Sequence, residues 1–221
     1  MDLVYCQGAD LCQELAGGAD VTFTRVYEGC PTSRVITDTD FFTLVADLSP
    51  LVFGHLLLLP RRHYLSFAQV IVDHKSLVTE IVTWLTPLYE ETFGPLVIME
   101  HGSSSGADHS ACITHAHWHI LPVDGSRVDE IMLDDGLTPQ DLEKLDQLGQ
   151  PPWTESAYFL CSYDEHHRLY TTANTLPRQY LRSVAARTLS IREPEWDYTL
   201  VVRKHLLKAT LDRAERWTCM P

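Results

Sequence analysis

Three histidines, His115, His117 and His119, occur at alternate positions near the middle of the chain. In an extended strand alternate side chains point to the same face, so the three imidazoles would form one surface while Ala116 and Trp118 pack behind them. The chain has eleven histidines, and their uneven placement is the most informative feature of its composition. The spacing therefore predicts a strand with one face that carries imidazole chemistry.

Such a strip has three interpretations. The first is a surface strand that happens to be rich in histidine. The second is a metal site, because alternate histidines on a strand are good ligands for zinc, iron or copper, although no obvious carboxylate completes it. The third is nucleophilic catalysis, because an imidazole with a reference pKa of about 6.5 is largely unprotonated at neutral pH. Flanking histidines could orient the nucleophile and protonate a leaving group.

A second group of motifs precedes the strip. Gly54 and His55 open an apolar run, Pro60 and His63 flank two arginines at its end, and the segment 47–50 reads Asp-Leu-Ser-Pro. In this order, and followed by a helix, the motifs resemble the histidine triad (HIT) superfamily of nucleotide hydrolases and transferases. The chain is similar to a bacterial-type member with a C-terminal extension, and the resemblance covers about residues 6–123.

This resemblance implies a covalent mechanism. His117 would attack the α-phosphorus of a nucleotide, and water, phosphate or another acceptor would release the nucleotidyl-imidazole. His119 would assist the leaving group, while His55 would hydrogen-bond within the triad that His115 begins and fix its tautomers. The substrate would be a dinucleoside polyphosphate, a nucleoside phosphoramidate or a similar phosphoanhydride, and the chemistry would need no cofactor.

The resemblance also implies binding residues. Asp47 matches the acidic residue that the family uses on ribose hydroxyls, although an Asp before Ser-Pro is equally typical of a turn. Phe41 and Phe42 match the strand that lines the base pocket, one contacting the base and the other lying in the core. Further candidates are backbone amides of Ser110, Ala111 and Cys112 for phosphate, and Gln179 and Arg182 in the extension.

Two positions depart from the family pattern. Glu100 stands where members commonly have an amide side chain, and Cys112 stands where they commonly have a hydroxyl. A carboxylate is unfavourable beside a phosphate, so we expect Glu100 to orient His101 or a triad member instead.

Some members hold a structural zinc, and the matching ligands here are Cys6, Cys12, His63 and His115. The family usually has Cys-x-x-Cys, whereas five residues separate Cys6 from Cys12. A wider loop can still close on a tetrahedral zinc ion, and the alternative is a pair of buried reduced cysteines.

The elements that would position these residues predict an α+β, HIT-like fold. It would have a largely antiparallel sheet of about five strands and a long helix, plus a C-terminal hairpin and helical extension. Strands are expected over 35–46, 53–59, 96–100 and 114–123. Leu77, Ile81 and Trp84 give a helix over 73–90 one buried face, and Pro87 should kink its last turn.

The chain divides into three expected parts. Residues 1–125 would form the nucleotide-binding catalytic domain, and residues 126–153 a polar linker with a short helix over 138–148 that starts at Thr138-Pro139. Residues 154–221 would form the extension, with a hairpin over 157–163 and 168–172 followed by two helices.

Composition limits the partners. Seventeen Lys and Arg against thirty Asp and Glu leave a formal net charge of −13, which argues against nucleic acid as the main partner. The most apolar stretch, 51–60, is half of the roughly 20 residues needed to cross a bilayer, and the N-terminus does not resemble a secretory signal. We therefore expect a cytoplasmic homodimer that acts on a small nucleotide. The alternatives are a metal-dependent enzyme that uses the three-histidine strand, and a catalytically silent nucleotide-binding protein on the same fold.

Overall fold

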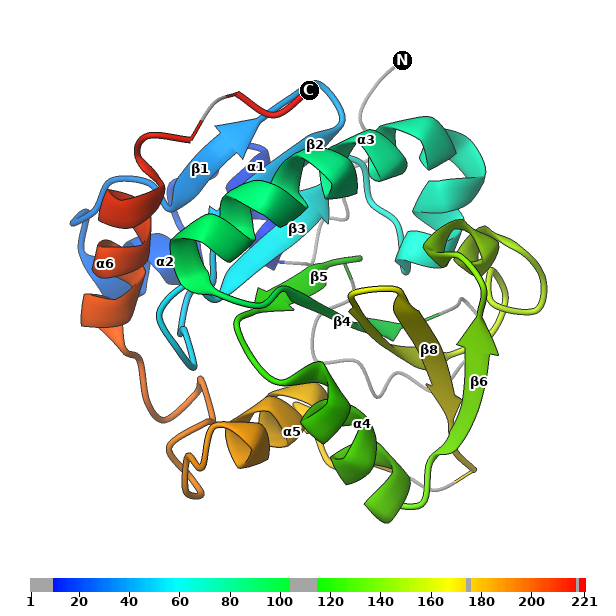
Figure 1. The fold of residues 1–221 in the computed structure, drawn as a ribbon. Helices are drawn as coiled ribbons and strands as arrows, with labels where there is room; N and C mark the ends of the chain where they lie inside the picture. Colours follow the sequence, from blue (N-terminus) through cyan, green and yellow to red (C-terminus); the bar gives the residue numbers. More distant parts are fainter. Residues whose placement is uncertain (1–9, 104–114, 174–175, 218) are drawn as a thin grey trace.

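The computed structural model describes residues 10–103, 115–173, 176–217 and 219–221. Within these ranges, eight strands form one sheet in the order β1-β2-β3-β5-β4-β7-β8-β6, and each neighbouring pair is antiparallel (Figure 1). Helices lie against this sheet, so the expected α+β class with a largely antiparallel sheet is confirmed.

The strands are β1 (Val35–Asp38), β2 (Phe42–Ala46), β3 (Leu56–Pro60), β4 (Val97–Gly102), β5 (Trp118–Leu121), β6 (Thr138–Leu142), β7 (Tyr158–Tyr163) and β8 (His166–Thr171). The helices are α1 (Asp10–Leu15), α2 (Thr22–Tyr27), α3 (Phe67–Phe93), α4 (Gly125–Asp134), α5 (Tyr180–Thr188) and α6 (Lys204–Ala214), with a 3-10 turn η1 (Leu145–Gly149). The sheet is larger than the five strands expected, because β7, β8 and β6 continue it beyond β4.

Both faces of the sheet are covered, which explains why β3 is apolar throughout. Leu56 and Leu58 lie in the core under α3, whereas Leu57 and Leu59 face the other side and pack with Leu11 of α1. Farther along that second face, a separate core joins β4 and β7 to α4 and α5. Figure 1 shows α3 across one face, with α4 and α5 together at the other end of the molecule.

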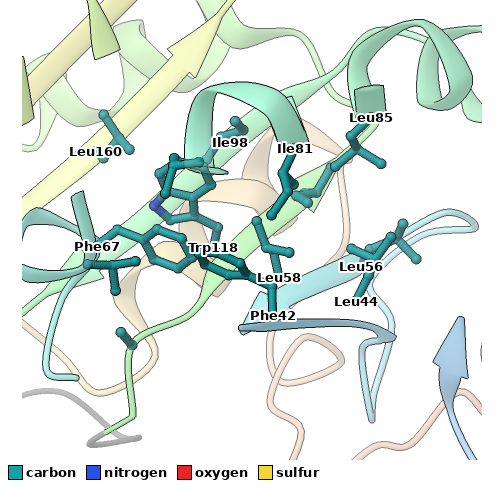
Figure 2. Close-up of a cluster of buried hydrophobic side chains, with 14 of the residues drawn as sticks. Phe42, Leu44, Leu56, Leu58, Phe67, Ile81, Leu85, Ile98, Trp118 and Leu160 are labelled. Atoms are coloured by element: carbon teal, nitrogen blue, oxygen red, sulfur yellow. The ribbon is translucent and has the colours of Figure 1, made fainter. Parts of the chain in front are cut away.

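The long helix α3 forms because apolar residues recur along one face. Val78, Ile81 and Leu85 are buried against the sheet, and Figure 2 shows Ile81 and Leu85 close to the apolar side chains of β3. The helix is longer than expected, and the kink expected at Pro87 was wrong. Non-helical dihedral angles occur instead at His74, and the helix continues past Pro87 to Phe93.

Two other expected elements were also wrong. The strand expected over 35–46 is a hairpin, because the Thr39 hydroxyl accepts hydrogen bonds from the amides of Phe41 and Phe42 and closes a turn. The first half of the helix expected over 138–148 is β6, which pairs with β8 at the edge of the sheet. An edge strand accepts Pro139, since proline there removes no needed hydrogen bond.

The stretch 126–153, expected as a polar linker, contains most of α4, then β6 and η1. The hairpin expected near 157–172 is confirmed as β7 and β8. The boundaries proposed for the three parts stay predictions. No helix in the described part of the chain is long and apolar enough to cross a bilayer.

Candidate active site

The strip of histidines lies on the sheet face opposite α3. Trp118 and Ile120 of β5 are buried under α3, and the Trp118 ring stacks on Phe67 with centroids 4.0 Å apart (Figure 2). Because side chains alternate along a strand, His117 and His119 project from the other face. The residues of β5 that face α3 thus anchor the strand, and the residues between them carry the imidazoles.

His117 has a defined tautomer. Its Nδ1 lies 2.8 Å from the backbone oxygen of His115, and a carbonyl oxygen can only accept a hydrogen bond, so Nδ1 carries the proton. The lone pair is therefore on Nε2. Burial lowers the pKa of His117 below its ordinary value, which favours the neutral, nucleophilic form.

His55 and His119 form a second chain of hydrogen bonds. The Leu51 amide donates to His55 Nδ1 at 3.2 Å, so His55 must carry its proton on Nε2 and donate it to His119 Nδ1 at 3.0 Å. His119 is left with its proton on Nε2. Burial lowers the pKa of His55 to about 4 and that of His119 well below its ordinary value, so both rings are neutral near pH 7.

His115 belongs to a different cluster. Its Nε2 donates to the Pro60 oxygen at 2.7 Å, so the unprotonated Nδ1 faces Cys12 Sγ at 3.1 Å, and Cys12 Sγ also lies 3.3 Å from His63 Nδ1. The three ligand atoms lie within 4.8 Å of one another. In a tetrahedral zinc site, sulfur and nitrogen ligands are about 3.5 Å apart, so Cys12, His63 and His115 fit zinc. Cys6, the fourth expected ligand, lies outside the described residues.

This arrangement separates the three histidines of the strip. Among the described side chains, the clusters with metal-ligand geometry contain His115 or His119 but never two of the three strip histidines. A single metal held by His115, His117 and His119 together is therefore not what the geometry favours.

Asp47 is buried beside the hydrogen bonds that link His55 to His119. Its Oδ1 accepts hydrogen bonds from the Ser49 amide at 2.8 Å and from Arg182 Nη1 at 3.2 Å, while Oδ2 lies 3.8 Å from His55 Nε2. Burial raises the pKa of Asp47, but the nearby His55 and the Arg182 charge outweigh it and hold that pKa below its usual range. A ribose contact by Asp47 stays a prediction.

Glu100 lies on the α3 side of the sheet, and the hydrogen bonds described for its carboxyl group involve neither His101 nor a triad imidazole. Its carboxyl group accepts hydrogen bonds from the Phe67 amide at 2.7 Å, the Trp118 indole at 3.1 Å and the Tyr158 hydroxyl at 2.8 Å. Glu100 thus links three elements: the start of α3, β5 through Trp118, and β7.

The aromatic and amide candidates lie elsewhere. Phe42 is buried in the core and stacks near Phe67, whereas Phe41 is exposed and contacts the His74 ring of α3. Gln179 donates to Asp197 at 2.7 Å within the extension. These contacts bring neither phenylalanine nor Gln179 to His117 or His119. Ser110, Ala111 and Cys112 lie outside the described residues.

His101 lies near the histidine strip, and the sequence did not lead us to expect it as a site residue. Met99 of β4 pairs with His119, so His101, two residues farther, lies on the same face at the level of His117. Its ring packs on Phe159 of β7 with centroids 4.4 Å apart. Strand alternation could have identified His101, since Glu100 and His101 must face opposite sides.

Comparison with known proteins shows what the part of the chain that carries this site is similar to. Residues 29–126 match the family model of the HIT domain, and no curated protein matches the chain. Similar solved structures include a HIT-like protein from Bartonella henselae, at 15% identity over 54% of this chain and 79% of that chain, with a TM-score of 0.41. A zinc-bound histidine triad protein from Mycobacterium smegmatis matches at 16% identity, 52% and 74% coverage and a TM-score of 0.37.

A histidine triad nucleotide-binding protein from Sulfolobus tokodaii matches more of the chain, at 17% identity over 88% of this chain and 91% of that chain, with a TM-score of 0.36. All three TM-scores are below 0.5, so the assignment depends on the family model and on the histidines described above. Residues 29–126 match the HIT domain, so this part of the chain is similar to proteins of the histidine triad superfamily.

Proposed function

We propose that this protein is a nucleotide hydrolase or nucleotidyl transferase that cleaves a phosphoanhydride or phosphoramidate bond at the α-phosphorus of a nucleotide. The observation that carries the proposal is the pair of tautomers at the site. Hydrogen bonds place a lone pair on His117 Nε2 and a proton on His119 Nε2, and the two ring centroids are 4.9 Å apart. A nucleophile and a proton donor thus lie side by side.

In the first step, His117 Nε2 forms a bond to phosphorus while the bond from phosphorus to the leaving group breaks. The leaving phosphate departs as an anion that accepts a hydrogen bond from His119 Nε2–H, whereas an amine leaving group takes its proton from solvent. His117 becomes a nucleotidyl-imidazolium whose Nδ1–H still donates to the His115 oxygen. That carbonyl dipole stabilises the positive charge on the ring.

In the second step, the acceptor reverses these changes. The oxygen of water or another acceptor forms a bond to phosphorus, and the bond from His117 Nε2 to phosphorus breaks and returns the lone pair to that nitrogen. The proton of the acceptor passes to solvent, and His119 keeps its Nε2–H throughout. The dyad returns to its starting tautomers with no external cofactor. Dinucleoside polyphosphates and nucleoside phosphoramidates both present such a bond, so both belong in the test.

The experiment is mass spectrometry of the protein mixed with a panel of these nucleotides. We expect an adduct with the mass of a nucleoside monophosphate on His117, and its loss in His117→Asn. His166→Asn is the matched control, because His166 is exposed on the distant β8. If His117→Asn kept full turnover, the covalent mechanism would be wrong. Binding without any turnover would support the silent nucleotide-binding alternative.

A second proposal is a structural zinc ion held by Cys12, His63 and His115, with Cys6 as the fourth ligand. The support is the donor set itself, since a thiol and two ring nitrogens converge and one of those nitrogens is unprotonated. Zinc would tie α1 to the strip and take no part in the chemistry. We expect elemental analysis to find one zinc per chain, lost in Cys12→Ala and retained in Cys30→Ala, whose cysteine is exposed.

A small nucleotide as the partner, a homodimer and a cytoplasmic location stay predictions.

A further inference from the structure

We propose that Arg182, which comes from the C-terminal extension, is a positioning residue of the histidine site. It holds Asp47, and Asp47 with its loop holds His55 in the orientation that fixes the His119 tautomer. This inference rests on the function proposed above for His117 and His119, and it makes the extension a working part of the catalytic centre.

Each of the three nitrogen atoms of the Arg182 guanidinium group donates a hydrogen bond. Nη1 donates to Asp47 Oδ1 at 3.2 Å, Nη2 to the Ser49 oxygen at 2.7 Å, and Nε to the Trp196 oxygen at 3.3 Å. The guanidinium carbon also lies 5.7 Å from the centre of the Tyr198 ring. Arg182 is only 6% exposed. A buried arginine with three acceptors is fixed in place, so it defines the position of what it binds.

Arg182 is one of three contacts by which the extension fixes the loop from Asp47 to His55. The Ser49 hydroxyl donates to the Val201 oxygen at 2.7 Å, and the Gly54 amide donates to Thr210 Oγ1 of α6 at 3.0 Å. Since these partners lie more than 130 positions away in sequence, the HIT domain cannot supply them itself.

Gly54 gives this loop little freedom to adjust. Its φ is +88°, and a Cβ atom there would lie 2.7 Å from the Phe93 ring. The loop therefore packs tightly beside His55, and the Leu51 amide that sets the His55 tautomer lies within it. Losing the Arg182 contacts would release the segment that carries both Asp47 and the Leu51 amide.

Charge gives a second reason for Arg182. An uncompensated Asp47 carboxylate, 3.8 Å from His55 Nε2, would compete with His119 for the His55 proton. Burial is the main reason that the pKa values of His55 and His119 are low, and Asp47 acts against it. The positive charge of Arg182 offsets the negative charge of Asp47, and it lowers the pKa values of His55 and His119. The neighbouring His117 lowers these pKa values too.

The test compares Arg182→Gln with Arg187→Gln. Arg187 lies on the same helix and also pairs with an aspartate, Asp135, but that pair is outside the site. We expect Arg182→Gln to lower kcat by about 10- to 100-fold with KM changed less than threefold, as for other residues that orient a catalytic group. Arg187→Gln should leave both constants unchanged. The acid limb of the kcat/KM profile should move to higher pH only in Arg182→Gln.

Two further variants separate positioning from general stability. Arg182→Lys keeps the charge but cannot bind all three acceptors, so its kcat should lie between those of the wild type and Arg182→Gln. It also replaces Arg182→Gln if that variant does not fold. Asp47→Asn combined with Arg182→Gln should lose no more activity than the worse single variant, because both substitutions break one chain of contacts.

A readout without substrate distinguishes the two proposals. Nitrogen-15 NMR of the ligand-free protein should show Nε2–H tautomers for His55 and His119, altered in Arg182→Gln and preserved in Arg187→Gln. If the wild type forms no adduct at His117, the proposed function fails, while the tautomer comparison still decides the role of Arg182. If tautomers and kcat are the same in both glutamine variants, the role assigned to Arg182 is wrong.

Discussion

Glu100 offers a sharp test of the electrostatics beneath the histidine strand. The group is 1% exposed, and its carboxyl oxygens accept hydrogen bonds from Phe67, Trp118 and Tyr158. Burial raises the pKa of Glu100 to about 7, although the three hydrogen bonds oppose the rise. The perturbation is Glu100→Gln, which has nearly the same shape but no titratable proton.

The magnitude follows from proton linkage. A glutamate in an unfolded chain has a pKa of about 4.3, so between that pH and about 7 the folded protein holds a proton that the unfolded chain has released. Stability from this group therefore falls as pH rises, by roughly 1.4 kcal/mol per pH unit. Over the whole interval the loss is about 4 kcal/mol.

Glu100→Gln removes this dependence and leaves all other titrations in place. Urea unfolding of both proteins from pH 4 to pH 8 gives the difference in free energy of unfolding at each pH. We expect the glutamine variant to gain about 3–4 kcal/mol relative to the wild type across that range. At pH 4 both side chains are neutral, so that end of the series is an internal control. A difference that stays flat, or that favours the wild type at high pH, would refute the reasoning.

Three other substitutions test the packing of the extension by urea unfolding. Gly102→Ala should cost about 1–3 kcal/mol or more, because the new Cβ would lie 2.2 Å from the buried Tyr158 ring, and an unchanged midpoint would contradict that packing. Asp129→Ala should cost about 3 kcal/mol, because it removes the acceptor of two tyrosine hydroxyls and of Arg168 Nη1, although Arg168 keeps its contact with Asp141. Trp217→Phe should cost about 1 kcal/mol, since it removes one indole hydrogen bond to α3, and a larger loss than for Asp129→Ala would reverse the expected ranking.

Local periodicity was enough to predict the part of the molecule that carries the histidines. The alternation around Trp118 identifies both the buried and the functional face of β5. The spacing of Leu77, Ile81 and Trp84 identifies the covering face of α3 only approximately, because Ile81 is buried whereas Leu77 and Trp84 are half-buried. These are properties of neighbouring residues, which a sequence states directly. The catalytic roles assigned to the histidines stay predictions.

Contacts between distant segments could not be predicted in the same way. The sequence marks Arg182 as a donor on a helix, but the structure gives it Asp47 as a partner 135 positions away. Pro139 is a typical first residue of a helix, yet pairing with β8 makes it part of an edge strand. Glu100 was expected to contact a histidine, whereas the register of β4 and β5 puts it beside Trp118. In each case the deciding partner lies on another element.

The pairing of β7 with β4 affects how readily the sheet could aggregate through an exposed strand edge. All six residues of β4 are paired with β7, so the strand next to β5 has no exposed backbone edge. A chain cut before β7 would present Val97–Gly102 as an open, apolar edge, the kind that templates aggregation. Among the described strands, the outer ones are β1, which is short, and β6, which is largely exposed and contains Pro139. The extension thus moves the edge of the sheet away from the histidines to strands that are poor templates.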